Sequence, residues 1–249
     1  MSEEKLNKES SLRLGFVLLD SKEIDWSVFY VSMKEEWDIE VTEQPNNDIL
    51  MVSKGDMMAA LSFMPAPIPG NEATENAKNN LFWKEAVAVT EKHQAQIMIS
   101  VMGEGNAIEK SIYFTQLVSS ALKMKNAIAI YFHPTVIEAE EYRSAANEIH
   151  EGRLPISNWI YFGFYQDEGK ISAYTNGLDY FNKLEIEVIK TEKDLAELAD
   201  MLFGIACYVV ESNVELQNGE TIGMSAEQKL SITLSEGVAT EKESLKIGF

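Results

Sequence analysis

The chain has 249 residues, and its 40 Asp and Glu side chains outnumber 21 Lys and Arg side chains, which gives a net charge of −19. This charge repels phosphates, and no stripe of Lys and Arg marks a basic surface, so we expect no nucleic-acid partner. Cys207 is the single cysteine, which excludes an internal disulfide and fits a reducing compartment. The three histidines lack the spacing of metal ligands, so we expect neither a metal site nor a cofactor.

The first residues are acidic and polar, whereas a signal peptide is basic and then apolar. No apolar run approaches the roughly 20 residues that span a bilayer. We therefore expect a cytoplasmic protein with no membrane partner. Polar composition also predicts a disordered tail at residues 1–11 and a flexible tail at residues 236–249.

An N-terminal half is expected over residues 12–93, because apolar runs and helical spacing alternate there with turn-like segments. In chain order we expect a strand, a helix, three strands and a long helix, at residues 12–19, 24–36, 37–41, 49–52, 57–64 and 71–93. The proline-rich segment 65–69 breaks the pattern before the last helix, and Asn71 is placed to cap that helix.

A C-terminal half is expected over residues 94–235, packed with the first half as one unit. In chain order we expect a strand, a helix, a strand, a helix, three strands, a long helix and a last strand, at residues 96–102, 108–122, 127–132, 138–150, 159–165, 170–175, 184–189, 191–209 and 229–234. The long helix has Thr191 and Asp194 at its start, a variant of the capping box.

These elements predict an α+β fold with largely antiparallel or mixed sheets and helices packed on them. The strands follow one another too closely for a parallel sheet, which needs a crossover between each pair of strands. The order of elements is similar in the two halves, which suggests two diverged similar halves, although no residue-level repeat accompanies that pattern.

One stretch imitates a phosphate loop. Gly103, Glu104 and Gly105 lie between a strand and a helix, where a dinucleotide-binding fold places its glycines. Ile108 stands at the third glycine position, and Glu104 would place an anion beside the phosphate. We expect an ordinary glycine turn.

Glu185 and Glu187 alternate with apolar residues along a predicted strand, so their side chains share one face. Two adjacent carboxylates can perform acid/base chemistry or hold a divalent cation. Alternate charges on a half-exposed strand are more often a solvated face, and that is the interpretation we favour.

Several of the eleven methionines fall in predicted strands, among them Met57, Met58, Met64, Met98 and Met102. Methionine is flexible and adapts to varied partners, so these side chains can line a binding surface. Filling of the protein core is the commoner use of this residue.

The order of several blocks resembles the bacterial family known as domain of unknown function 4261. The blocks lie at residues 59–69, 83–86, 93, 174–178, 181, 184–187 and 219–223. The resemblance spans residues 14–232. It departs from the family at Asn182, where a glycine is usual, and Asn tolerates the left-handed turn that such a glycine provides. The resemblance implies a cytoplasmic bacterial α+β protein and transfers no catalytic residue.

Two functions fit the sequence. The first is a non-enzymatic acidic module that binds a basic protein, in the way that immunity proteins neutralise toxins. The alternative is a small-molecule-binding enzyme or sensor with a cleft between the two halves. That cleft would be formed by Trp83, His93, Thr175, Asn176, Asp179, Glu220 and Thr221. It requires the turns at Asn176 and Asn218 to meet in space.

Overall fold

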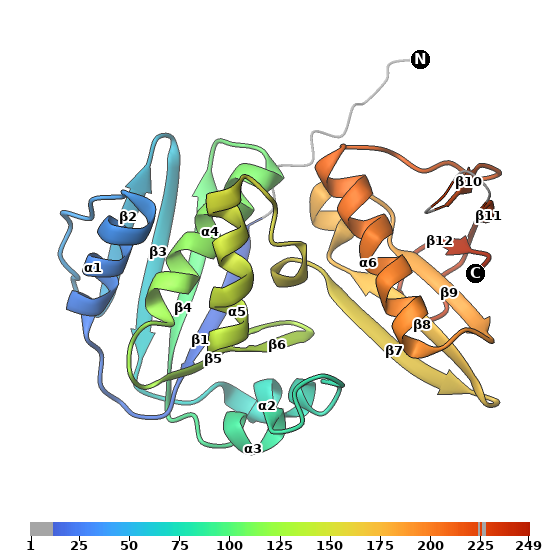
Figure 1. Ribbon diagram of the computed structural model, residues 1–249. Helices are drawn as coiled ribbons and strands as arrows, with labels where there is room; N and C mark the ends of the chain where they lie inside the picture. Colours follow the sequence, from blue (N-terminus) through green and yellow to red (C-terminus); the bar gives the residue numbers. More distant parts are fainter. Residues whose placement is uncertain (1–11, 224, 226–227) are drawn as a thin grey trace, which may run out of the picture. The chain divides into compact units, whose positions relative to one another are not determined.

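The computed structural model describes residues 12–223, 225 and 228–249 (Figure 1). The chain divides into two compact units, of which unit 1 ends at Arg153 and unit 2 begins at Leu154. Helices and antiparallel or mixed sheets build both units, so the predicted α+β class is confirmed. The tail expected at residues 1–11 lies outside the described residues.

Unit 1 is built on a six-stranded sheet with the strand order β2-β3-β4-β1-β5-β6, in which all neighbours are antiparallel. Its strands are β1 (Arg13–Leu19), β2 (Ile49–Lys54), β3 (Met57–Met64), β4 (Ala95–Gly103), β5 (Ala127–Phe132) and β6 (Thr135–Glu138). Successive side chains of a strand point to opposite faces, so Val17 and Leu18 enter different buried clusters.

The two faces of this sheet carry different helices (Figure 1). One face packs against α1 (Trp26–Trp37), α4 (Ala107–Ala121) and α5 (Ala139–Ala146), which share a large buried cluster with all the strands of the sheet. The other face packs against α2 (Glu72–Ala77) and α3 (Ala86–Thr90). The smaller cluster under α2 and α3 takes its strand residues from β1, β5 and β6 and includes no described residue of β2, β3 or β4.

The strand expected at residues 37–41 does not form. Asp38 adopts a left-handed conformation and ends α1, and the amide of Ile39 donates back to the carbonyl of Met33. This pattern satisfies the last carbonyls of the helix and uses an amide that a strand would need.

The single helix expected at residues 71–93 is divided into α2 and α3. The side chain of Asn80 accepts hydrogen bonds from the amides of Phe82 and Trp83, which forms a turn between the two helices. Asn71 precedes α2 in a left-handed conformation and makes no side-chain capping bond, so its expected role is also wrong. Local side-chain bonds of Asn therefore override the helical pattern here.

The boundary expected between residues 93 and 94 is not where the units divide. β4 begins at Ala95 and pairs with both β1 and β3, so the segment after His93 completes the first sheet. β5, β6 and α5 also belong to unit 1. The halves expected from the order of elements are therefore not the compact units of the structure, because antiparallel pairing joins strands that are distant in sequence.

Unit 2 contains a second six-stranded sheet, with the order β10-β11-β12-β9-β8-β7. Its strands are β7 (Tyr161–Asp167), β8 (Lys170–Asn176), β9 (Ile186–Thr191), β10 (Thr221–Ile222), β11 (Leu230–Ser235) and β12 (Ser244–Ile247). β12 is parallel to β9, whereas the other neighbours are antiparallel. α6 (Leu195–Glu211) starts at Asp194, whose side chain accepts from the amide of Glu197, and it packs on β7 and β8.

Residues 236–249 were expected to form a flexible tail, but they contain β12, which lies between β9 and β11. Leu245 and Ile247 are buried there, with exposed fractions of 3% each. The polar composition of the segment concealed this strand because its buried polar residue, Ser244, bonds a carboxylate inside the unit.

Candidate functional site

His93 has a structural role in unit 1. Its Nε2 accepts a hydrogen bond from the amide of Ile68 at 3.0 Å, and its Nδ1 lies 2.5 Å from the carbonyl oxygen of Thr90. Because that carbonyl can only accept, Nδ1 carries the proton and Nε2 does not. Both ring nitrogens of the buried His93 are therefore engaged in bonds that fasten the proline-rich segment 65–69 to the end of α3.

Trp83 lies in the same region of unit 1. Its ring is buried in the cluster under α2 and α3, with an exposed fraction of 7%, and its amide donates to Asn80. Trp83 and His93 thus belong to one packed layer, where they contribute to the core. They do not belong to the unit that contains the other five predicted site residues.

In unit 2, the carboxylate of Glu185 organises the turn after β8. Its Oε2 accepts from the hydroxyl of Thr175 at 2.6 Å, and its Oε1 accepts from the amides of Gly177 and Asp179 at 2.8 and 3.2 Å. The Thr175 oxygen in turn accepts from the amide of Ile186. Burial raises the pKa of Glu185, although these hydrogen bonds act in the opposite direction.

The predicted site residues of this turn have different surroundings. Thr175 is fully buried, whereas Asn176 and Asp179 are exposed, and the Asp179 carboxylate lies 3.6 Å from Lys242. Asn182, which stands where the family usually has glycine, adopts a left-handed conformation with φ of 58°, as the sequence predicts. The turn is therefore held by internal hydrogen bonds, and its Asn176 and Asp179 side chains are exposed.

Glu187 is not part of a solvated face. Its side chain is fully buried, and its carboxylate accepts from the amides of Val238, Ala239 and Thr240 and from the hydroxyl of Ser244. The Nζ of Lys246 lies 2.8 Å away. Burial opposes ionisation, but these donors outweigh it and lower the pKa of Glu187 to about 2. Sequence reasoning missed this role because the donors come from a segment that looked like a tail.

The last two predicted site residues, Glu220 and Thr221, lie at the far edge of the second sheet. Glu220 is exposed and accepts from the amide of Gln217, and Thr221 begins β10. Strands β11, β12 and β9 separate β10 from β8, which holds Thr175. At about 4.8 Å per strand, this separation is about 19 Å. The structure does not bring the two Asn-Gly turns together, so they do not form one site.

Two adjoining hollows do lie in unit 2, on either side of residues 214–216. The smaller hollow has a volume of about 300 Å³ and is lined by Leu184, Ile186, Val209 and Leu216, with polar residues at its border. The other is more open, has a volume of about 930 Å³ and includes Tyr208, Glu220 and Thr221. Of the predicted site residues, only Glu220 and Thr221 border a hollow described here.

Exposed apolar side chains of unit 1 gather on its sheet, where α2 and α3 leave one half uncovered. Cross-strand pairing places Met58 opposite Met102, and Met98 opposite both Ser62 and Phe16. We define the methionine face as the residues of β1 to β4 that share this side, apart from Leu18, which is buried in the cluster under α2 and α3, and Gln96, which is buried and donates to the carbonyl of Ala66. The residues of the face are Leu14, Phe16, Ile49, Met51, Ser53, Met58, Ala60, Ser62, Met64, Met98, Ser100 and Met102.

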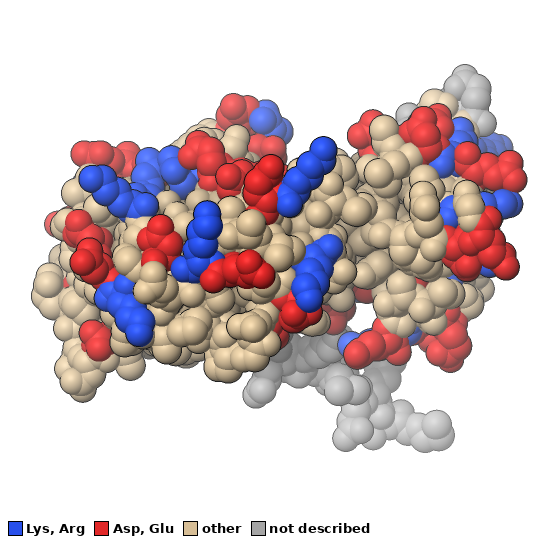
Figure 2. All heavy atoms as spheres, turned by 90° about the horizontal axis from the view of Figure 1, so that it is seen from below, with Lys and Arg blue, Asp and Glu red and all other residues tan. Residues whose placement is uncertain are grey.

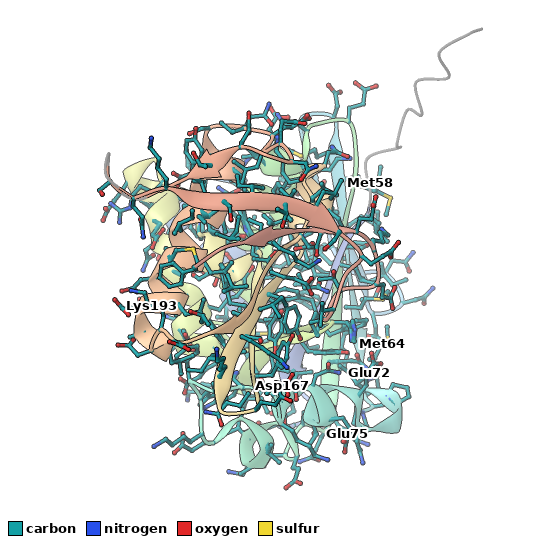
Figure 3. All side chains as sticks on the ribbon, turned by 90° about the vertical axis from the view of Figure 1, so that its right-hand side faces the viewer. Met58, Met64, Glu72, Glu75, Asp167 and Lys193 are labelled. Atoms are coloured by element: carbon teal, nitrogen blue, oxygen red, sulfur yellow. The ribbon has the colours of Figure 1, made fainter. Side chains whose placement is uncertain are left out.

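The methionine face is uncharged, and its large apolar side chains are exposed or partly exposed. The exposed fractions are 43% for Met58, 41% for Met102, 37% for Met51 and 38% for Leu14. No residue of the face is charged, although 24% of the chain consists of Asp, Glu, Lys and Arg. Figure 3 shows Met58 and Met64 projecting on the same side of unit 1 as Glu72 of α2.

Carboxylates border this face. Asp56 and Glu104 are exposed at the end near Met58 and Met102, where the Glu104 amide donates to the Asp56 carbonyl. Asp48 is exposed at the opposite end, just before β2. Glu72 accepts from the hydroxyl of Tyr131 at 2.6 Å, and the Tyr131 ring stacks on Phe16.

The period of two at Met58, Ala60, Ser62 and Met64 was the sequence signal for this face. That pattern shows which residues share a side but not whether a helix covers them. The choice between core and surface therefore depended on the length of α2 and α3, which end short of β3 and β4.

The described residues include no group of three or more His, Cys, Asp or Glu side chains placed to hold a metal ion. Among the same residues, no helix has the length and apolar character to cross a bilayer.

Comparison with known proteins gives a match over one region of the chain. The family model described as "Domain of unknown function (DUF4261)" matches residues 174–248, whereas no curated protein and no solved structure matches the chain. The match contains the Glu185 turn, buried Glu187 and the border of both hollows, and the earlier blocks of the expected resemblance lie outside it. The similarity to the DUF4261 family therefore covers a part of unit 2.

Proposed function

We propose that this protein is a non-enzymatic binding module for a basic protein, which it neutralises in the way that immunity proteins block toxins. We further propose that it acts in the cytoplasm of a bacterium. The observation that carries the binding role is the uncharged methionine face of unit 1, whose large apolar side chains are exposed or partly exposed. Contiguous apolar surfaces on otherwise polar proteins are typical of protein interaction sites.

The net charge of −19 supports a basic partner, because it accelerates association with cations and repels other acidic proteins. The charge alone does not locate the interface. On the surface seen in Figure 2, acidic and basic side chains are interspersed and form no single acidic field. The methionine face with its carboxylate border is therefore the stronger support for a defined docking surface.

Affinity capture with the full chain tests this function. Lysate is passed over the immobilised protein at low salt and, in parallel, over an unrelated acidic protein of similar charge. Each protein enriched only on this chain is then purified and its dissociation constant measured at several salt concentrations. We expect a basic protein whose affinity falls as salt rises. Repeated capture of nothing beyond the acidic control contradicts the proposal.

A second function, small-molecule binding in unit 2, is favoured by the hollow of about 300 Å³, whose size suits a small ligand. Leu216 borders both hollows, so Leu216→Trp fills space in them. We expect fragments that bind the full chain in ligand-observed NMR to lose binding to this variant. Fragments that bind both forms equally place the small-molecule site elsewhere.

A further inference from the structure

We propose that the methionine face receives an amphipathic helix of the partner, with an apolar stripe on the sheet and Lys or Arg side chains along its margins. This inference rests on the proposed function and specifies the surface and the kind of partner. It uses only residues of unit 1.

The layer of helices on the side of the methionine face is incomplete among residues 12–153. The opposite face of the same sheet is covered by α1, α4 and α5. On the side of the methionine face, α2 and α3 have six and five residues and reach β1, β5 and β6. A sheet face with apolar side chains is stable when another layer covers it, and helices supply that layer elsewhere in unit 1. Within residues 12–153, no helix therefore covers the half over β2, β3 and β4.

The dimensions fit that helix. The three strands β2, β3 and β4 span about 10 Å between their outer axes, and residues 58–64 extend for about 20 Å. A helix with side chains is about 10 Å wide, and about 13 residues cover 20 Å. One helix of three to four turns therefore matches the open area.

The composition of the face suits a partner helix better than a small ligand. Met51, Met58, Met64, Met98 and Met102 provide flexible thioether side chains that adapt to the shape of a helix. The small residues Ala60, Ser62 and Ser100 lie between them and leave room for projecting side chains. Methionine-rich grooves that bind amphipathic helices are a known mode of recognition.

The carboxylates around the methionine face indicate which side chains the margins of the partner helix carry. Asp48, Asp56, Glu104 and Glu72 border the face, and none of the residues within it is basic. Lys or Arg side chains beside the apolar stripe would meet these carboxylates, whereas acidic margins would be repelled. A second copy of this chain is disfavoured, because two carboxylate borders and two net charges of −19 would face each other.

The test uses the full chain labelled with carbon-13 at the methionine methyl groups. The probe is a 14-residue peptide of Leu and Lys arranged with helical periodicity, and the control is a scrambled peptide of the same composition. We expect the methyl signals of Met51, Met58, Met98 and Met102 to shift on titration. The signals of Met33, Met124 and Met201 should stay unchanged, because these side chains are at most 3% exposed.

A matched pair of variants gives a second readout. Met58→Lys combined with Met102→Lys places cations on the face, and we expect it to weaken peptide binding at least tenfold. Val31→Lys introduces a cation at a still more exposed apolar position on α1, where the exposed fraction is 53%, and should leave binding unchanged.

Several results would overturn the inference. Absence of peptide binding, equal binding of the scrambled peptide, or binding that leaves the methyl signals of the face unmoved each removes the helix site. Shifts of these signals on raising the concentration of the protein alone would assign the face to a second copy. In all these cases a basic partner recovered by affinity capture would still support the proposed function, so the two failures are distinguishable.

Discussion

Glu187 and Lys246 lie opposite each other on the parallel strands β9 and β12, and the fully buried carboxylate of Glu187 is 2.8 Å from the Lys246 Nζ. The same carboxylate gathers the amides of Val238, Ala239 and Thr240. One side chain thus fastens residues 238–246 to the centre of the second sheet.

Replacing Glu187 by Gln should destabilise unit 2. The substitution leaves Lys246 without its buried anion, and breaking such a pair typically costs about 3 kcal/mol or more. Urea unfolding should show this loss at pH 7, and hydrogen exchange should quicken at residues 238–240. The matched control is Asp38→Asn, which removes the exposed ion pair with Lys34 and should leave stability nearly unchanged. Equal effects of the two variants would contradict the anchoring role.

Glu185 and Glu187 should give unit 2 opposite responses to pH. The pKa of Glu187 is lowered from 4.5 to about 2, so its stabilisation is complete above pH 4.5 and is lost as the pH falls toward 2. Burial raises the pKa of Glu185 above 4.5, so its contribution is complete below that pH and is lost as the pH rises through the raised pKa.

Two variants separate these responses. Glu185→Gln should remove the loss of stability on the alkaline side, because the amide oxygen still accepts from Gly177 and Asp179 without ionising. Glu187→Gln should remove the loss on the acidic side. Unfolding free energies measured from pH 2 to 8 check both slopes, and an unchanged pH profile in either variant would refute the corresponding assignment.

His93→Ala should destabilise unit 1 by about 1 to 3 kcal/mol, because it leaves the buried amide of Ile68 without an acceptor. Lys92→Ala, at the exposed neighbouring position, is the control and should have little effect. Urea unfolding followed by near-ultraviolet circular dichroism measures both. If the hydrogen bonds of His93 made no contribution to stability, the two variants would unfold at the same urea concentration.

Oxidation provides a test of the methionine face that needs no partner. Hydrogen peroxide should convert Met51, Met58 and Met102 to sulfoxides before Met33, Met124 and Met201, because the first three are exposed and the others are buried. Peptide mass spectrometry over a time course gives the order. Oxidation of the buried group at the same rate would mean that the cores of unit 1, with Met33 and Met124, and of unit 2, with Met201, are not protected as described.

The sequence predicted the fold class and most elements with strong periodicity. It did not predict the unit boundary, because the pairing of β4 with β1 and β3 joins residues about 30 to 90 positions apart in the chain and leaves no local signal. The strand expected at residues 37–41 does not form, because Asp38 ends α1 with capping bonds. The helix expected at residues 71–93 is interrupted, because the Asn80 side chain bonds backbone amides of a turn.

The candidate site was predicted only in part, again because contacts between segments distant in sequence leave no local signal. Thr175, Asn176 and Asp179 do lie in one turn, because they are neighbours in sequence, and the Glu185 carboxylate accepts from the Thr175 hydroxyl and the Asp179 amide. Their expected approach to Glu220 and Thr221 depended on strand order, which places three strands between β8 and β10. The burial of Glu187 depended on a long-range segment whose composition is polar.

The position of β12 has a consequence for synthesis of the chain. β10 and β11 connect to β7, β8 and β9 only through β12, yet β12 is the last strand of the sequence. Unit 1 has all six of its strands once Glu138 has left the ribosome, so it can fold while translation continues. The second sheet stays in two pieces until residues 244–247 emerge. A nascent chain halted shortly before Ser244 would therefore carry a finished unit 1 and an open-edged, aggregation-prone unit 2.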